Sequence, residues 1–185
     1  MEGGIVIKVF IKKTTAILFV MTIIMMSTYV VYEIAFFKTL VIAFSTTLYH
    51  FSMRLLVGFI YQQKFDNNIS WENKWFQVSK KEMSIYQTIN VKSWKKYIPT
   101  YDSSFFDVQR KSFQQIAMAM CQAELVHETI IVFSFLPIIA FVWFGAIEVF
   151  IITSIVSAFI DLIFVIVQRY NRPRILKILQ TRTDK

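Results

Sequence analysis

Four long stretches with few or no charged residues alternate with polar segments along the chain. They cover residues 14–32, 39–61, 125–144 and 147–168, and the first is nineteen residues long. At about 1.5 Å of rise per residue, a helix of that length spans roughly 28 Å, which matches a bilayer core. The pattern therefore predicts an all-α integral membrane protein with four transmembrane helices.

The polar segments that separate these spans differ greatly in length. Residues 33–38 and the turn at Gly145 are short connections, whereas residues 62–112 form a long polar segment rich in Trp, Lys and Asn. This segment is too short for an independent domain with a substantial core. Tryptophans gather at membrane interfaces, so we expect one membrane domain, 1–185, with an interfacial loop and helix region between the second and third spans.

Two finer predictions concern the second half of the chain. Residues 103–123 are expected to form a helix that continues into the third span. Pro137 inside that span is expected to kink it, with the freed carbonyl satisfied by neighbouring groups. The hydrophobic pattern ends at Gln168, so residues 169–185 are expected to form a basic, partly amphipathic tail.

Composition and charge agree with a membrane protein and suggest its orientation. The chain is 56% hydrophobic, its net charge is +8, and its single cysteine excludes an intramolecular disulfide. Positive charges lie at the N-terminus, in residues 62–112 and in the tail, while the short connections carry only Lys38. The positive-inside rule then places both termini and the long segment in the cytoplasm of a multi-pass cell-membrane protein. Lipid head groups explain the charge, and no helix-turn-helix or zinc-finger spacing supports nucleic-acid binding.

Several ionisable residues fall in the cytoplasmic halves of the predicted spans. They are His50, Arg54, Glu124, His127, Glu128 and Asp161. Each is costly in a bilayer unless it is paired or hydrated, so one shared polar pocket is the cheapest arrangement. We therefore treat this set as the candidate site.

Within this set, His127 is the best candidate for a general base. Glu124 or Glu128 on the same helix would orient its imidazole. A metal site built from these three residues and His50 is an alternative, although Glu-x-x-His-Glu is not an established zinc spacing. Cys121 is an alternative acyl-accepting nucleophile, but a lone cysteine is more often a small buried residue.

The same residues also have plainer interpretations. Arg54 would reach the interface by snorkelling. Asp161 would pair with Arg54 simply to hold two helices together, and Glu124 and Glu128 would be solvated carboxylates at a helix start.

Arginines follow the fourth span directly. Arg169, Asn171, Arg172 and Arg174 lie where this helix leaves the bilayer. Arginine clusters at such places bind phosphate or carboxylate groups of lipids and of soluble anionic carriers. The alternative is a plain positive-inside anchor.

Four short motifs occur in a familiar order. They are Trp71-Glu-Asn-Lys-Trp75-Phe76, Trp94-Lys-Lys-Tyr97-Ile-Pro99, Ala123-Glu124-Leu-Val-His127 and Gln168-Arg169-Tyr170-Asn171-Arg172-Pro173-Arg174. In them the chain resembles the glycosyl-4,4'-diaponeurosporenoate acyltransferases, which are small integral membrane enzymes of Gram-positive bacteria. The resemblance covers roughly residues 50–177, and the Glu-x-x-His and tail motifs are its most specific parts.

This resemblance implies transfer of a fatty acyl chain to a hydroxyl of a lipid or glycolipid at the cytoplasmic face. His127 would be the base, and Arg54 or His50 would stabilise the oxyanion. The donor would be acyl-CoA or an acyl carrier protein, with no other cofactor and no metal. The residues expected to bind the substrates are Arg169, Asn171, Arg172, Arg174, Trp71, Trp75, Trp94 and Asp161.

Three other functions fit the same sequence. A non-catalytic scaffold or chaperone of a lipid or cell-envelope pathway would use residues 62–112 to bind a partner. A membrane metal-dependent hydrolase would use the histidines and carboxylates of the candidate site. A small transporter or channel would need a homo-oligomer to form a continuous pathway.

Overall fold

A computed structural model describes residues 3–94, 106–107 and 109–183, and within these residues the chain is helical with no strand. The helices are α1 (Gly3–Tyr32), α2 (Ala35–Phe65), η1 (Lys74–Phe76), α3 (Lys80–Thr88), α4 (Val91–Trp94), α5 (Phe113–Phe133), η3 (Leu136–Ala140), α6 (Phe141–Phe144) and α7 (Ile147–Thr183). Four helical segments are long and apolar enough to cross a membrane: Lys8–Tyr32, Ala35–Phe65, Phe113–Phe144 and Ile147–Thr181. The predicted all-α membrane fold with four spanning helices is confirmed.

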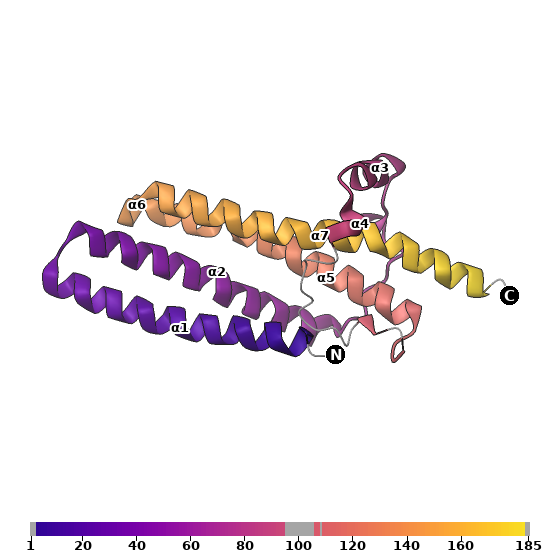
Figure 1. Cartoon of the computed structure of the whole chain (residues 1–185), viewed down its shortest axis with the longest axis horizontal. Helices are drawn as coiled ribbons and strands as arrows, with labels where there is room; N and C mark the ends of the chain where they lie inside the picture. Colours follow the sequence, from indigo (N-terminus) through magenta and orange to yellow (C-terminus); the bar gives the residue numbers. More distant parts are fainter. Residues whose placement is uncertain (1–2, 95–105, 108, 184–185) are drawn as a thin grey trace.

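The spanning helices form two antiparallel hairpins that lie side by side (Figure 1). One hairpin consists of α1 and α2, and the other consists of α5, η3 and α6 followed by α7. Helices α3 and α4 lie beside α7, at the end where α2 stops and α5 begins; we call this end the loop end. Both termini point towards the loop end, and the two short turns lie at the other end (Figure 1).

The short turns need backbone conformations that few residues adopt. Glu33 joins α1 to α2 with a φ of 53°, and Gly145 and Ala146 join α6 to α7 with φ of 72° and 53°. Glycine is the residue that reaches positive φ without steric cost. The tight turns fold each helix back on its predecessor and so produce the hairpins.

The third spanning segment is not one kinked helix. Helix α5 ends at Phe133, and the chain continues as η3 with Pro137 in its first turn. Proline lacks an N–H and its ring clashes with an upstream carbonyl, so an α-helix ends before it more readily than it passes through it. In contrast, α7 passes through Pro173 and continues to Thr183, so residues 169–183 are part of a long helix rather than a separate tail.

The start of α5 also differs from the sequence prediction. The helix begins at Phe113, because Ser112 and Gln115 form a capping box that satisfies the first backbone N–H groups. The predicted start at residue 103 is wrong for Asp107 and for residues 109–112, which are not helical, while residues 103–105 lie outside the described residues.

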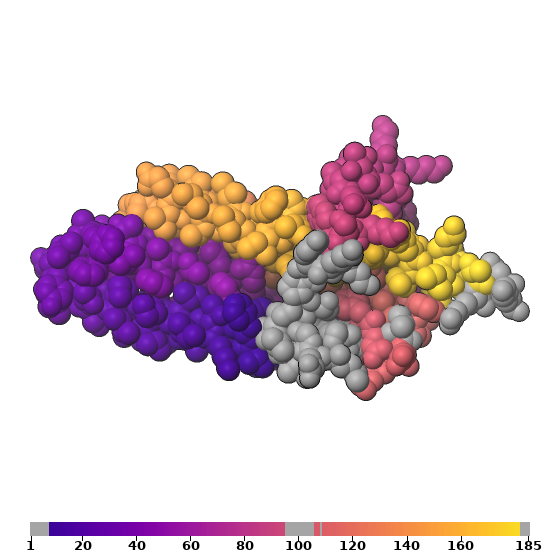
Figure 2. All heavy atoms as spheres, viewed as in Figure 1, coloured from indigo at the N-terminus to yellow at the C-terminus, as the bar shows by residue number. Residues whose placement is uncertain are grey.

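Burial is concentrated where α2, α5 and α7 meet. Small and polar side chains of α7, namely Ser154, Ser157 and Ala158, let the helices approach closely and are all buried. Helix α1 packs on α2 and has no buried residue in its apolar window, so its surface faces lipid. Residues 74–94 form a lobe that projects beside α7 at the loop end (Figure 2).

Candidate functional site

Two side chains of α5, Glu124 and His127, contact α7 from one face of the helix. Glu124 and His127 are three residues apart, so they lie on one face of the helix a turn from each other. Because α5 and α7 are antiparallel, Glu124 meets the loop-end part of α7 and His127 meets a deeper part. One motif therefore contributes to two polar clusters.

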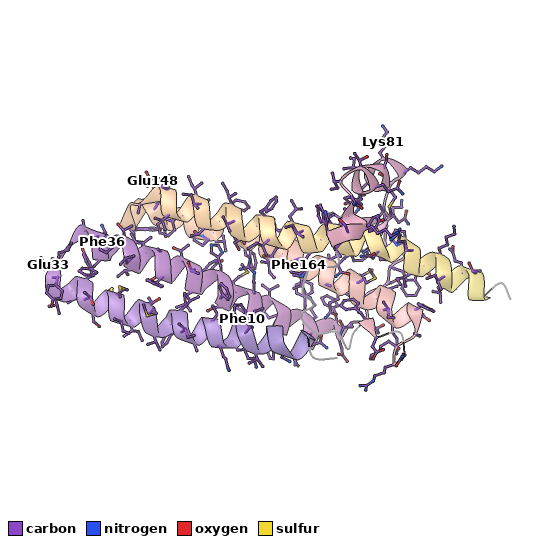
Figure 3. All side chains as sticks on the ribbon, in the orientation of Figure 1. Phe10, Glu33, Phe36, Lys81, Glu148 and Phe164 are labelled. Atoms are coloured by element: carbon purple, nitrogen blue, oxygen red, sulfur yellow. The ribbon has the colours of Figure 1, made fainter. Side chains whose placement is uncertain are left out.

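The deeper cluster is built on Asp161. One carboxylate oxygen lies 2.7 Å from Nδ1 of His127, and the other lies 2.5 Å from Nη2 of Arg54. The same Arg54 nitrogen donates to Oγ of Ser157 at 2.9 Å. Phe164 stacks on the His127 ring with a centroid distance of 4.7 Å, and it lies at mid-length of the molecule (Figure 3). Three helices thus hold one carboxylate between a cation and an imidazole.

This arrangement fixes the orientation of the imidazole. A carboxylate only accepts hydrogen bonds, so Nδ1 of His127 carries the proton that points to Asp161. In the neutral tautomer that donates to Asp161, the other ring nitrogen, Nε2, is the acceptor, and it has no hydrogen-bond partner among the described residues. Asp161 itself is only 2% exposed, while the His127 side chain is 23% exposed. We call His127 and Asp161 the dyad.

The dyad changes the predicted partners of His127. Neither Glu124 nor Glu128 orients the imidazole, because Glu124 is held by arginines and Glu128 accepts from Nε1 of Trp75 at 2.8 Å. Arg54 does not snorkel, since its side chain is only 18% exposed and pairs with Asp161. The plainer expectation of an Arg54–Asp161 pair agrees with the structure, but Asp161 binds His127 as well.

The second cluster, which we call the arginine cluster, consists of Glu82, Glu124, Arg169 and Arg172. Glu124 is fully buried, accepts from Nη1 of Arg169 at 2.6 Å and is also bound by Arg172. Arg169 binds Glu82 through Nε at 2.5 Å and Nη2 at 3.1 Å. Two carboxylates and two guanidinium groups balance, so the cluster is neutral and ties α3 and α5 to α7.

Backbone and aromatic groups complete the arginine cluster. Arg172 donates to the carbonyl of Phe76 and lies 5.1 Å above its ring, and Arg169 donates to the carbonyl of Trp75 at 3.1 Å. Hydrogen bonds from Arg169 lower the pKa of Glu82 below its ordinary value. Burial, with the Glu82 hydrogen bond, raises the pKa of Tyr86 to about 12. The segment before α3 is therefore fastened to the loop end.

The arginines expected to hold an anionic donor are in different situations. Arg172 is 1% exposed and, like Arg169, is already bound to carboxylates. Arg174 is exposed and lies over the ring of Tyr170 at 4.5 Å. Asn171 donates to the carbonyl of Val167 in its own helix.

The predicted aromatic residues are spread over the loop end. Trp75 is 60% exposed, Trp71 is half-buried, and Trp94 packs against the cluster of Tyr86, Val91 and Tyr170. Tyr97 and Pro99 lie outside the described residues.

Two other candidates of the sequence are the Cys121 nucleophile and the metal site. Cys121 is fully buried, as expected of a small apolar residue. Across the described part of the chain, no three His, Cys, Asp or Glu side chains gather as a metal site would need, so the metal alternative gains no support.

His50 lies next to the deeper cluster. It is 4% exposed, and neither ring nitrogen has a hydrogen-bond partner among the described residues. It is one turn deeper than Arg54 on α2 and close enough to interact electrostatically with Arg54 and Asp161. His50 is therefore a neighbour of the dyad that forms no hydrogen bond with it.

Some residues of the site were missed by the sequence analysis. Glu82 carries a signal, because Ser79 caps α3 by accepting from its backbone N–H, a pattern that marks a helix start. Ser157 and Asp161 are four residues apart and so share a helix face, which a helical-spacing search would have found. Phe164, which stacks on His127, has no signal in an apolar stretch.

Comparison with known proteins identifies a family. A family model described as glycosyl-4,4'-diaponeurosporenoate acyltransferase matches residues 72–181, which is more than half of the chain. Searches of curated proteins and of solved structures return no match. The matched region contains both motifs that meet at Glu124, together with the dyad.

Proposed function

We infer that this chain, which belongs to the glycosyl-4,4'-diaponeurosporenoate acyltransferase family, moves a fatty acyl group from a thioester donor to a hydroxyl of a membrane lipid or glycolipid. The observation that carries this proposal is the dyad. Asp161 fixes the His127 ring by a hydrogen bond of 2.7 Å and leaves Nε2 free to accept a proton. A carboxylate that orients a histidine in this way is a recurring device of acyl transfer.

The reaction follows from that geometry. Nε2 of His127 takes the proton of the acceptor hydroxyl while the hydroxyl oxygen attacks the acyl carbon. A tetrahedral intermediate forms, its carbon–sulfur bond breaks, and the leaving thiolate takes the proton back from His127. One ester and one free thiol result, so atoms and charges balance without a further reactant.

Asp161 and Arg54 act on this step as positioning residues. Asp161 holds the ring and stabilises the imidazolium that forms when the proton arrives. Arg54 is bound to Asp161 at 2.5 Å, and its positive charge stabilises the buried carboxylate at this depth.

The arginine cluster supports the dyad from one turn away. Glu124 is fixed by Arg169 and Arg172, and this anchors the α5 turn that carries His127. We therefore assign Arg169 and Arg172 a structural role rather than a donor-binding role. This assignment explains why the two most specific motifs of the family meet in space.

The donor would be acyl-CoA or an acyl carrier protein, with no other cofactor. Its anionic head would meet exposed cations of the loop end, of which Lys80, Arg174 and Lys177 have no carboxylate partner among the described residues. Glu128 follows His127 in the chain and accepts a hydrogen bond from the exposed indole of Trp75, and both side chains would be available to an acceptor. The acyl chain itself would lie in the bilayer.

The loop end would face the cytoplasm. Its lysines and arginines satisfy the positive-inside rule, and thioester donors are cytoplasmic molecules. Both termini lie towards this end, so both would be cytoplasmic as well (Figure 1).

Acyl transfer by the purified protein in liposomes tests the proposal. A labelled acyl-CoA or acyl carrier protein is supplied with membrane lipids and glycolipids, and labelled lipid is measured. We expect His127→Gln to lower the rate by about 10²–10⁴ while its thermal unfolding stays close to that of the wild type. Glu148→Gln is the control, because Glu148 lies at the opposite end from the loop end (Figure 3). Full activity of His127→Gln would remove this residue from the mechanism, and an inactive wild type with both donors would contradict acyl transfer.

A further inference from the structure

Buried polar side chains line the contact of α2, α5 and α7 beyond the dyad. Thr46, His50, Ser134 and Ser154 are all less than 5% exposed. Thr46 donates to the carbonyl of Ile42 at 2.7 Å, and Ser134 donates to that of Ile130 at 2.8 Å. In contrast, both ring nitrogens of His50 and Oγ of Ser154 have no hydrogen-bond partner in the part of the chain that the structure describes.

The two unpartnered residues lie at one level of the bundle. Helices α2 and α7 run in the same direction, and Arg54 of α2 contacts Ser157 and Asp161 of α7. His50 is one turn before Arg54, and Ser154 is one turn before Ser157. Moving back one turn on both helices therefore brings His50 to the level of Ser154.

Such groups are exceptional in a membrane protein. No water is available in the bilayer core to satisfy them, and nearly all buried polar atoms in native proteins have a partner. A leucine at position 50 and an alanine at position 154 would fill the space without this penalty. Local violations of this kind are expected where a ligand uses the group.

We propose that His50 and Ser154 bind a second hydroxyl group of the lipid substrate, deeper in the membrane than the hydroxyl or ester that meets His127. This proposal rests on the proposed acyl transfer. A neutral imidazole and a serine each offer one donor and one acceptor, and a hydroxyl offers the same in return. A charged group would not fit, because Arg54 and Asp161 already balance each other in the neighbouring turn.

The helical rise sets the depth of this subsite. Four residues separate His50 from Arg54, and seven separate Ser154 from Asp161, which correspond to roughly 6 Å and 10 Å along the axis. The substrate would therefore carry a hydroxyl on its chain about 6–10 Å deeper in the membrane than the level of Arg54 and Asp161. Both the acceptor lipid and the acyl chain of the donor are sources of such a hydroxyl.

Access to the subsite would be lateral. His50 on α2 and Ser154 on α7 are both buried within the bundle. Besides the Arg54 contacts, hydrogen bonds from Tyr49 to the Phe133 carbonyl and between Tyr61 and Thr129 join the hairpins. Separation of α2 from α7 would open the subsite to lipid rather than to water, which suits a lipid substrate.

Ser154→Ala is the central variant, because it removes one hydroxyl and little volume. Thr46→Val is the matched control, since the Thr46 hydroxyl is satisfied within its own helix. His50→Leu removes both ring nitrogens, and His50→Gln restores a donor and an acceptor. The KM for the lipid substrate, kcat and the thermal midpoint are measured for each variant in liposomes or detergent.

We expect Ser154→Ala to raise the KM for the hydroxylated substrate about three- to tenfold, the range of one lost hydrogen bond, with kcat unchanged. Its thermal midpoint should be equal to or above that of the wild type, because an unpaired buried hydroxyl is gone. His50→Leu should behave likewise, and His50→Gln should recover part of the KM. An equal KM for Ser154→Ala, Thr46→Val and the wild type would overturn the proposal and leave a purely structural polar layer.

Substrate pairs identify which molecule carries the hydroxyl. Long-chain diols are compared with matching mono-alcohols as acceptors, and hydroxylated with plain acyl-CoA as donors. If the wild type prefers the hydroxylated member of one pair and Ser154→Ala does not, that pair identifies the molecule that carries the hydroxyl. If the wild type shows no preference in either pair, the subsite is contradicted. Retention of diol over mono-alcohol by purified wild type and Ser154→Ala, measured by mass spectrometry, tests the subsite even if no acyl transfer occurs.

Discussion

Replacing Glu124 with alanine removes the carboxylate that accepts from both arginines of the arginine cluster. Glu124 is fully buried and Arg172 is 1% exposed, so the Arg172 guanidinium would be left buried beside the Phe76 carbonyl and ring, with no carboxylate partner among the described residues. Arg169 would keep Glu82. Breaking a buried ion pair from one side costs about 3–5 kcal/mol.

Thermal unfolding of the purified protein in detergent measures this cost. In a chain of this length, each kcal/mol shifts the midpoint by about 2–4 °C, so Glu124→Ala should lower it by roughly 6–20 °C. Glu72→Ala, at an exposed carboxylate, is the control and should stay within about 0.5 kcal/mol of the wild type. Replacing Glu124 and Arg172 together by Leu and Met should recover much of the loss, because no charge is then buried alone. A Glu124→Ala midpoint equal to that of the control would refute this account of the cluster.

Three further predictions concern the loop end and the turns. Arg169 lowers the pKa of Glu82 from its ordinary value of 4.5, so the wild type should be more stable than Glu82→Gln above pH 4.5. This difference in stability should shrink as the pH falls below 4.5. A difference that is independent of pH would contradict this prediction. Gly145→Ala should destabilise the protein by about 1–3 kcal/mol, since the φ of 72° and ψ of −154° at this position suit glycine. In contrast, Gly58→Ala should stabilise the protein by about 0.5–1 kcal/mol, because Gly58 lies inside α2 and an added Cβ would have no neighbouring atom within 4 Å. In the turn after α2, the backbone N–H of Asn67 donates a hydrogen bond to Oε1 of Gln122 at 2.6 Å. Gln122→Ala removes this bond, so limited proteolysis should cut the turn faster in the variant than in the wild type.

The sequence predicts the membrane fold well because its signal is local. Uncharged runs of span length and short turns suffice for four helices in two hairpins. Local signals also mislead: the apolar pattern crosses Pro137 without a break, although the backbone there changes to η3. It stops at Gln168, although α7 continues to Thr183 because contacts with α3 and α5 stabilise its polar turns.

The sequence predicted the site as a set and the Arg54–Asp161 pair within it, but not the partners of His127 and Glu124. Depth in the membrane is enough to group Arg54, His127 and Asp161, and their cost in lipid is enough to expect pairing. Which partner each one takes depends on the register of α5 against α7, and no single-sequence pattern encodes that. Glu124 and Glu128 are the carboxylates nearest to His127 in sequence, yet with the antiparallel packing of α5 and α7 His127 contacts Asp161 instead.

The acyl-transfer rates of His127→Gln, Asp161→Asn and the double variant test the central claim most directly. All three are measured in liposomes, with thermal unfolding as a check on folding. If His127 and Asp161 act as one unit, each single change lowers the rate strongly and the double variant is no slower than His127→Gln alone. Losses that multiply in the double variant, or an Asp161→Asn variant as fast as the wild type, would contradict the dyad.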